Sequence, residues 1–181
     1  SDLQKNMETN HLDITREMIG IRLEIFNEKT SKYEPPNYIL LKKKVKSDSW
    51  ALFKHTIPVY LDVQSRFDSS NGGPVISYKD IYLFAKSVYV QLALGSKRTQ
   101  KLQELEEEEL IGDLKVDLEA AVASFVTNGL EVRLFLKEDQ IISCFVKKLE
   151  NLGTLSIAQL EVMFLGPLQD LKYKLTHLNN H

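Results

Sequence analysis

The sequence predicts an α+β protein built from two small units in series. Its 181 residues are enough for one ordinary domain or for two small ones. A run of three strands followed by a helix occurs twice in the hydrophobic pattern, and a charged stretch at residues 104–112 separates the two runs. We therefore expect domains at residues 11–105 and 106–181, each an antiparallel strand meander packed against helices.

Three strands are expected in the first unit. Residues 19–25 alternate apolar and polar, which is the pattern of a strand with one buried face, and residues 38–41 form a short apolar second strand. Residues 53–61 predict a third strand, which Pro58 would restrict to a sheet edge. The side chains expected on one face of this third strand are Phe53, His55, Ile57, Val59 and Leu61.

A loop and a long helix complete the first unit. Residues 64–74 are rich in Ser, Asn and Gly and predict a loop, and Ser77 with Asp80 predicts a capping box at a helix start. The helix has apolar residues on two sides, and one sheet can bury only one of them. The second side packs on another part of this chain or on a partner protein. The two sides are Ile81, Phe84, Ala85, Val88 and Leu92, and Leu83, Val90 and Leu94.

The polar stretch after Ser96 is expected to connect the units. Basic residues 97–101 precede an acidic run at residues 104–109. That order opposes the helix dipole, because acidic side chains are unfavourable at a helix C-terminus. The acidic run is therefore expected to begin a connecting turn.

The second unit repeats the pattern. Alternation over residues 114–126 predicts one strand, an Asn-Gly dipeptide predicts a hairpin turn, and residues 130–136 and 141–146 predict two more strands. The first strand is expected to place seven side chains on one face. They are Leu114, Val116, Leu118, Ala120, Val122, Ser124 and Val126.

A helix broken by a Gly-Pro dipeptide is expected at the end of the chain. Ser156 with Gln159 predicts its start, and Gly166-Pro167 breaks or kinks it. The apolar side of the two halves is formed by Ile157, Leu160, Phe164, Leu168, Leu171, Leu175 and Leu178.

Composition indicates a soluble protein with a hydrophobic core. Hydrophobic residues make up 43% of the chain and charged residues 27%, which excludes dominant disorder. The longest uncharged stretch, residues 120–130, is too short to span a bilayer. A net charge of -2 gives no general attraction to DNA or anionic lipid, so contact with nucleic acid would be local.

We recognise no catalytic, cofactor-binding or metal-ligating motif in the sequence. The histidines His11, His55, His177 and His181 are scattered, and no glycine-rich phosphate loop is present. Cys144, the one cysteine, is expected between Ile142 and Val146 on a buried strand face as an inert thiol, and a lone thiol fits a reducing compartment. His55 is expected to be a hydrogen-bonded core side chain.

Two lysine-rich stretches could contact DNA locally. One comprises residues 42–46 and the other residues 97–101. The first has no interleaved aromatic residue and lies at a strand end, where lysines commonly protect sheet edges.

The run at residues 50–61 resembles a motif of the CENP-O family of inner-kinetochore proteins. Those proteins have an aromatic and aliphatic strand followed by His, Ser or Thr, a branched apolar residue and Pro, as His55-Thr56-Ile57-Pro58 does here. Residues 20–24 and 37–41 resemble the family's first two strands, and residues 81–102 resemble its long helix. The second half matches in its order of elements.

The resemblance implies a double RWD protein without enzymatic activity, in which two small α+β sandwiches follow each other. It implies a scaffold subunit at the centromere and kinetochore of the nucleus that supports chromosome segregation. The expected partners are CENP-P, a double RWD protein with which it pairs, and CENP-Q and CENP-U in the assembly called the COMA complex in yeast. Because CENP-P has the same architecture, it is the alternative paralogue. No cofactor, membrane or small-molecule substrate is implied.

The C-terminal half is expected to provide the pairing surface, because the family's C-terminal domains are expected to dimerise. The candidate contact residues are Val132, Leu134, Phe135, Leu168, Leu171 and Leu175. One alternative is a ubiquitin-conjugating-like enzyme variant with Cys144 as acceptor thiol, since RWD domains resemble those enzymes in fold. That alternative lacks the His-Pro-Asn element of such enzymes. The other alternative is a local DNA-binding module.

Overall fold

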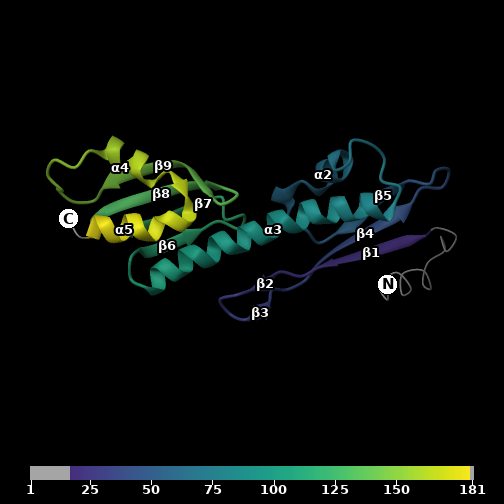
Figure 1. Cartoon of the computed structure of the whole chain (residues 1–181), viewed down its shortest axis with the longest axis horizontal. Helices are drawn as coiled ribbons and strands as arrows, with labels where there is room; N and C mark the ends of the chain where they lie inside the picture. Colours follow the sequence, from purple (N-terminus) through teal and green to yellow (C-terminus); the bar gives the residue numbers. More distant parts are fainter. Residues whose placement is uncertain (1–16, 180–181) are drawn as a thin grey trace. The chain divides into compact units, whose positions relative to one another are not determined.

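The chain folds into two compact units, and the boundary between them along the sequence falls within one helix. The computed structural model describes residues 17–179, and Figure 1 shows their helices and strands. One unit extends to Ala93 and the other begins at Leu94, so the division lies inside helix α3 (Tyr78–Glu107) and earlier than the expected one between residues 105 and 106. Every sheet is antiparallel, which confirms the α+β prediction at the level of fold class.

The first unit contains a three-stranded sheet in the order β1-β4-β5. Its strands are β1 (Met18–Leu23), β4 (Asn37–Lys43) and β5 (Trp50–His55), and a separate short hairpin is formed by β2 (Phe26–Asn27) and β3 (Lys32–Tyr33). The first two predicted strands are therefore confirmed with somewhat different bounds.

The predicted third strand at residues 53–61 is wrong in its second half. Strand β5 ends at His55, and a 3-10 helix, η1 (Val59–Leu61), and a helix, α2 (Val63–Ser69), follow it. Pro58 has no N–H for a strand ladder. Asp62 adopts a φ of 46°, and its carboxylate caps α2 by accepting the N–H of Ser65. The loop expected at residues 64–74 is thus helical up to Ser69.

Two side chains of β5 that were expected on a buried face do not lie in the core. The register between β4 and β5 shifts between Leu40 and Leu41, so Phe53 is an extra residue on β5. Phe53 and His55 are exposed, contrary to the predicted buried face.

Helices α2 and α3 cover one face of the first sheet. The predicted capping box is present: the N–H of Asp80 donates to Ser77 Oγ (3.2 Å), and Asp80 Oδ2 accepts the N–H of Ser77 (2.9 Å). Hydrogen bonds from the backbone N–H groups of Ser77 and Ile76 hold the pKa of the Asp80 carboxyl below its ordinary value. The core of this unit contains Leu23, Ile39, Leu41, Trp50, Ile57, Leu61, Val63, Phe67, Val75, Ile81, Phe84 and Val88.

The acidic run was expected to begin a connecting turn, but no turn begins at Glu104. Helix α3 continues to Glu107, and the chain leaves it at Glu109, which has a φ of 61°. The packing of Leu102 and Leu105 in the core of the second unit explains this outcome, because burial of two leucines outweighs the small dipole penalty.

The second unit is a five-stranded sheet with helices on one face. The strand order is β10-β9-β8-β7-β6. The strands are β6 (Gly112–Val116), β7 (Val122–Thr127), β8 (Leu130–Lys137), β9 (Gln140–Lys148) and β10 (Gly166–Pro167). The helices are α4 (Ile157–Phe164), the 3-10 turn η2 (Leu168–Asp170) and α5 (Leu171–Asn179). Leucines of α3, α4 and α5 pack with the inward side chains of β7, β8 and β9 in one core.

The single strand predicted at residues 114–126 is two strands joined by a turn. The Asp117 carboxylate accepts the N–H groups of Ala121 (2.8 Å) and Val122 (3.0 Å), and Ala120 has a φ of 57°. The reversal changes which face is buried. On β7 the buried residues are Ala123, Phe125 and Thr127, while the predicted inward residues Val122, Ser124 and Val126 are only half-buried and Leu118 is 85% exposed.

The expected final helix begins where the sequence predicts, and the Gly-Pro dipeptide divides it into separate helices. The N–H of Gln159 donates to Ser156 Oγ (3.3 Å), which caps α4. Gly166 and Pro167 separate α4 from η2 and α5, and they also add β10 to the edge of β9 opposite Ile141 and Gln140. Within residues 17–179, every helix is too short or too polar to cross a bilayer.

A buried arginine joins α3 to two turns of the second sheet. Arg98 is 6% exposed, and its guanidinium donates to three backbone carbonyl oxygens: Ala120 (2.7 Å), Glu119 (2.9 Å) and Glu138 (2.9 Å). These oxygens belong to the β6–β7 and β8–β9 turns. Gly95, one turn earlier on α3, permits the close approach, because a Cβ there would lie 3.3 Å from Glu119 O.

Replacing Arg98 is expected to destabilise the second unit. Arg98→Ala removes the hydrogen-bond donors of one buried and two partly buried carbonyl groups and should lower the free energy of unfolding by about 3 kcal/mol. Urea titration followed by far-UV circular dichroism measures the change. The control is Lys97→Ala, an exposed neighbour on α3, which should change the value by less than about 0.5 kcal/mol. An unchanged midpoint for Arg98→Ala would contradict this assignment.

Candidate protein-interaction surfaces

Five of the six predicted contact residues lie in the core of the second unit. Val132, Leu134, Leu168, Leu171 and Leu175 are all buried there. Their side chains therefore hold β8, η2 and α5 together and do not reach solvent. Phe135 alone among the six lies on the sheet face opposite the core, where it is half-buried.

An apolar patch surrounds Phe135 on that outer face. We call it the sheet patch and define it as Val122, Phe135, Ile142 and Phe145. Phe135 lies opposite Val122 on β7 and opposite Ser143 on β9, and its ring meets that of Phe145 edge to face at 5.8 Å between centroids. Phe145 is 61% exposed and Ile142 56%.

A β-bulge on β9 creates part of this patch. The register between β8 and β9 shifts at Phe135 and Leu136, so Ile141 turns into the core and Ile142 turns outward. The expectation that Ile142 shares the buried face of Cys144 is therefore wrong. Alternation alone places Ile142 inside, so the sequence contained no signal for this part of the patch.

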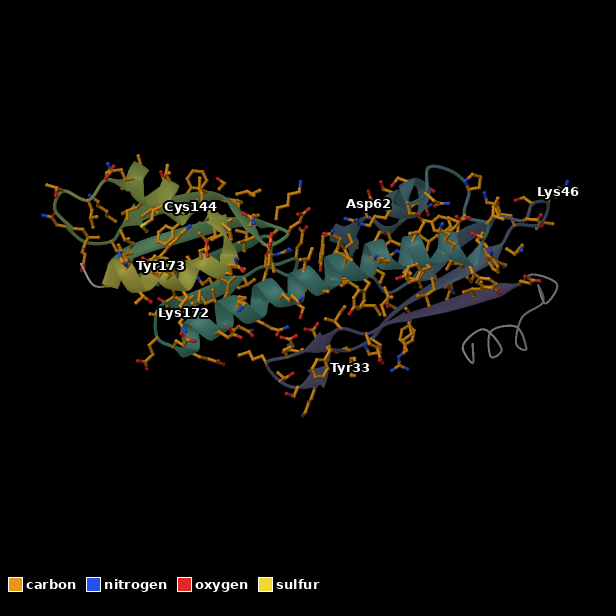
Figure 2. All side chains as sticks on the ribbon, in the orientation of Figure 1. Tyr33, Lys46, Asp62, Cys144, Lys172 and Tyr173 are labelled. Atoms are coloured by element: carbon orange, nitrogen blue, oxygen red, sulfur yellow. The ribbon has the colours of Figure 1, made fainter. Side chains whose placement is uncertain are left out.

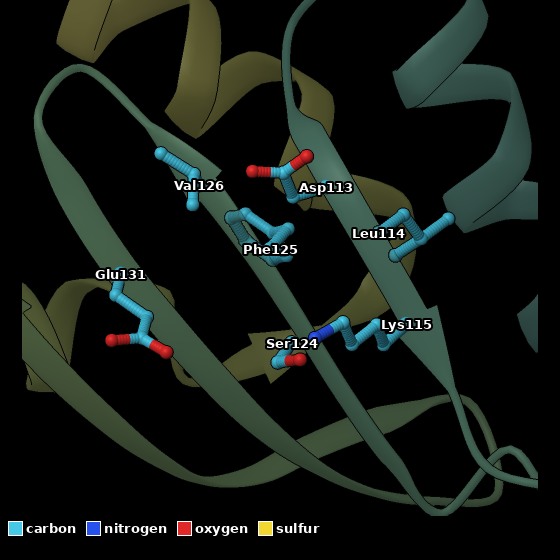
Figure 3. Close-up of a pocket in the computed structure, with 7 residues that line it drawn as sticks. All are labelled: Asp113, Leu114, Lys115, Ser124, Phe125, Val126 and Glu131. Carbon is cyan, nitrogen blue, oxygen red and sulfur yellow. The ribbon is translucent and has the colours of Figure 1, made fainter.

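A polar hollow occupies the same sheet farther from Phe135. It has a volume of about 550 Å³, and Figure 3 shows it over β6, β7 and β8. Lys115 lies opposite Ser124, while Glu131 lies opposite Val126. The residues that line it are Asp113, Leu114, Lys115, Ser124, Phe125, Val126 and Glu131.

A second apolar surface lies on the first half of α3. Leu83 and Val90, from the predicted second side of this helix, are exposed, and three tyrosines lie beside them. We call this the helix face and define it as Tyr78, Tyr82, Leu83, Tyr89 and Val90. The first unit therefore leaves part of the second side of α3 in solvent.

The geometry of Cys144 does not suit a nucleophile. The side chain, labelled in Figure 2, is buried, and burial together with the nearby Glu161 carboxylate raises the pKa of its thiol to about 12. Glu161 itself is held by the N–H of Val146, which donates to its Oε2 (3.0 Å). A thiol acceptor needs the opposite environment, exposed and electropositive.

The histidines of the described residues are structural or solvent-exposed. His55 is exposed, contrary to the predicted core position, and its Nδ1 accepts the N–H of Ile57 (3.1 Å). His177 stacks on Tyr173 with 5.0 Å between ring centroids. His11 and His181 lie outside the described residues. Across residues 17–179, no three His, Cys, Asp or Glu side chains are grouped so as to hold a metal ion.

The chain also matches a known protein family. The family model described as "Cenp-O kinetochore centromere component" covers residues 6–160, which is most of the chain. The chain belongs to the CENP-O family. Membership confirms the resemblance carried by residues 50–61 and makes the chain a kinetochore component at the centromere, in the nucleus.

Two curated relatives within the CENP-O family are inner kinetochore subunits. The chain is 46% identical over 177 residues to the inner kinetochore subunit MCM21 of Saccharomyces cerevisiae, covering 97% of this chain and 48% of that protein. It is 30% identical over 151 residues to the inner kinetochore subunit MCM21 of Kluyveromyces lactis, covering 77% of this chain and 50% of that protein. The chain thus spans about half the length of these relatives.

The reactivity of the Cys144 thiol tests whether this residue is structural and not a nucleophile. A rise in pKa from 9.0 to about 12 lowers the thiolate fraction near neutral pH about a thousandfold. Native Cys144 should therefore react with Ellman's reagent far more slowly than the same thiol in urea-unfolded protein. Equal rates in the two states, or thioester formation with ubiquitin and its activating enzyme, would contradict the structural role of Cys144.

Proposed function

We propose that this chain is a non-enzymatic scaffold subunit of the inner kinetochore that pairs with a CENP-P-like double RWD protein through the sheet patch. The observation that carries the proposal is the Phe135–Phe145 aromatic pair on the uncovered face of the second sheet. Assembly with CENP-Q-like and CENP-U-like proteins, and a role in chromosome segregation, belong to the same proposal.

The sheet patch has the features of a protein interface core. Two of its members are phenylalanines, aromatic residues of the kind enriched at interfaces, and lysine and glutamate lie around them. Arg133 and Lys147 are on the same face of β8 and β9, and Glu131 lies opposite Lys147. An apolar centre with a charged rim favours a specific partner over nonspecific aggregation.

The patch is also well ordered before a partner binds. Phe135 and Phe145 are held by regular pairing of β7, β8 and β9 and by each other. Since the side chains are already fixed by the sheet, less conformational entropy is lost on association. Full burial of one Phe side chain contributes about 1.5–3 kcal/mol, so two such side chains could dominate the binding energy.

The two units themselves fit a pair of RWD-like domains in series. Each has an antiparallel meander with helices on one face, and the core of each unit is separate. We include this tandem RWD architecture in the proposal because family membership supports it. A partner with the same architecture would present a similar uncovered sheet face.

Charge introduced into the sheet patch should prevent pairing without unfolding the chain. Phe145→Glu alters a side chain that is mostly exposed, so the fold should persist. Its Kd for the CENP-P-like protein should rise about tenfold or more, because an apolar contact is replaced by a charge without a partner. Isothermal titration calorimetry measures the Kd, and circular dichroism checks the fold.

The matched control places the same charge on the other apolar surface. Tyr82→Glu changes an exposed aromatic residue of the helix face and should leave the Kd unchanged. A folded Phe145→Glu variant that binds like the parent, or a Tyr82→Glu variant that alone loses binding, would contradict the assignment of the interface to the second sheet.

A further inference from the structure

Five lysines lie on the hairpin formed by β4 and β5. Lys42 and Lys43 end β4, Lys44 and Lys46 lie in the turn that follows, and Lys54 lies on β5. We call this set the basic hairpin. Lys46 is labelled at the tip of the turn in Figure 2. The whole chain has a net charge of -2, so this concentration of positive charge is local.

Aromatic rings hold several of these lysines in place. Lys42 Nζ lies 4.9 Å and Lys54 Nζ 5.3 Å from the centroid of the Phe53 ring, and Lys43 Nζ lies 5.0 Å from that of Trp50. Because of the β-bulge on β5, Phe53 and Lys54 lie together between the pairs Leu41–Leu52 and Ile39–His55. The sequence did not show it, because the aromatic residues come from the neighbouring strand and not from residues 42–46.

The turn between β4 and β5 is ordered by hydrogen bonds. The N–H of Lys44 donates to Ser49 O (3.0 Å), the N–H of Ser49 donates to Ser47 Oγ (2.9 Å), and the hydroxyls of Ser47 and Ser49 are hydrogen-bonded to each other. Lys44 and Lys46 are therefore presented from a defined backbone and project into solvent.

Acidic side chains neutralise part of this charge. Glu17 Oε2 lies 4.0 Å from Lys43 Nζ, a long and exposed contact that is worth little. Asp48 is the acidic residue of the turn itself. The exposed side chains of Lys44, Lys46 and Lys54 therefore supply positive charge that a polyanion can use.

We propose that the basic hairpin binds the phosphate backbone of duplex DNA, without reading its sequence. Lysines lie along the hairpin from its two strands to the tip of the turn, so their charges are spread over a length that a row of phosphates on a rigid duplex can match. The CENP-O family is a centromere component, so DNA is the polyanion at its location. This surface belongs to the first unit and does not depend on the sheet patch.

An acidic peptide is the competing occupant, and the shape of the site favours DNA over it. A peptide would need a groove in which the lysines converge. The hollow beside the hairpin has a volume of about 290 Å³ and is lined by Lys42, Lys43, Lys44, Val45, Ala51, Leu52 and Phe53. Lys46 and Lys54 are not among its lining residues, so much of the charge lies outside it.

Fluorescence anisotropy with a labelled duplex of about 25 base pairs tests the proposal on the full chain. At about 50 mM salt the parent should bind with a Kd in the micromolar range, and log K should fall with log salt with a slope of roughly -3. The triple variant Lys44→Glu, Lys46→Glu, Lys54→Glu changes only exposed side chains. Its affinity should fall about tenfold or more and its salt slope should approach zero.

The matched control is Lys97→Glu with Lys101→Glu, two exposed lysines of α3, which should bind DNA nearly as the parent does. The proposal is overturned if the parent does not bind the duplex, if the triple variant binds like the parent, or if the control loses as much affinity. A poly-glutamate competitor that displaces the duplex at equal charge concentration would overturn it in favour of an acidic peptide.

Discussion

The second unit depends on Arg98 being buried with its charge satisfied by backbone carbonyls. A guanidinium removed from water costs several kcal/mol unless its N–H groups are paired, and here three carbonyl oxygens from two turns accept them. The same contacts fix the ends of β6, β7, β8 and β9 against α3. The sheet can therefore keep its outer face free of helices and still remain rigid.

The parts of the fold that follow from local chemistry could be predicted from the sequence. The capping box at Ser77, the N-cap at Ser156 and the alternation of β8 each rest on neighbouring residues, and all are confirmed. The errors occur where one residue changes the register. The Asp117 turn and the bulge at Ile142 reverse which side chains are buried, and simple alternation contains no signal for them.

The candidate surfaces were harder to predict for the same reason. The spacing of apolar residues along a strand or helix is the same whether their side chains pack in the core or against a partner. Val132, Leu134 and Leu171 proved to be core residues. Phe135, on the polar side of the alternation of β8, is the one candidate that lies outside the core. The outward position of Ile142 became known only with the register of β9. The Lys42–Phe53 contact likewise depends on the pairing of two strands.

The central claim is that the outer face of the second sheet is where a CENP-P-like partner binds. Photo-crosslinking with p-benzoylphenylalanine tests it most directly, since the residue replaces Phe145 with another aromatic side chain and reports contact only at short range. The account predicts a crosslink to the partner from position 145 and none from position 82 on the helix face. A crosslink from position 82 with none from position 145 would contradict it.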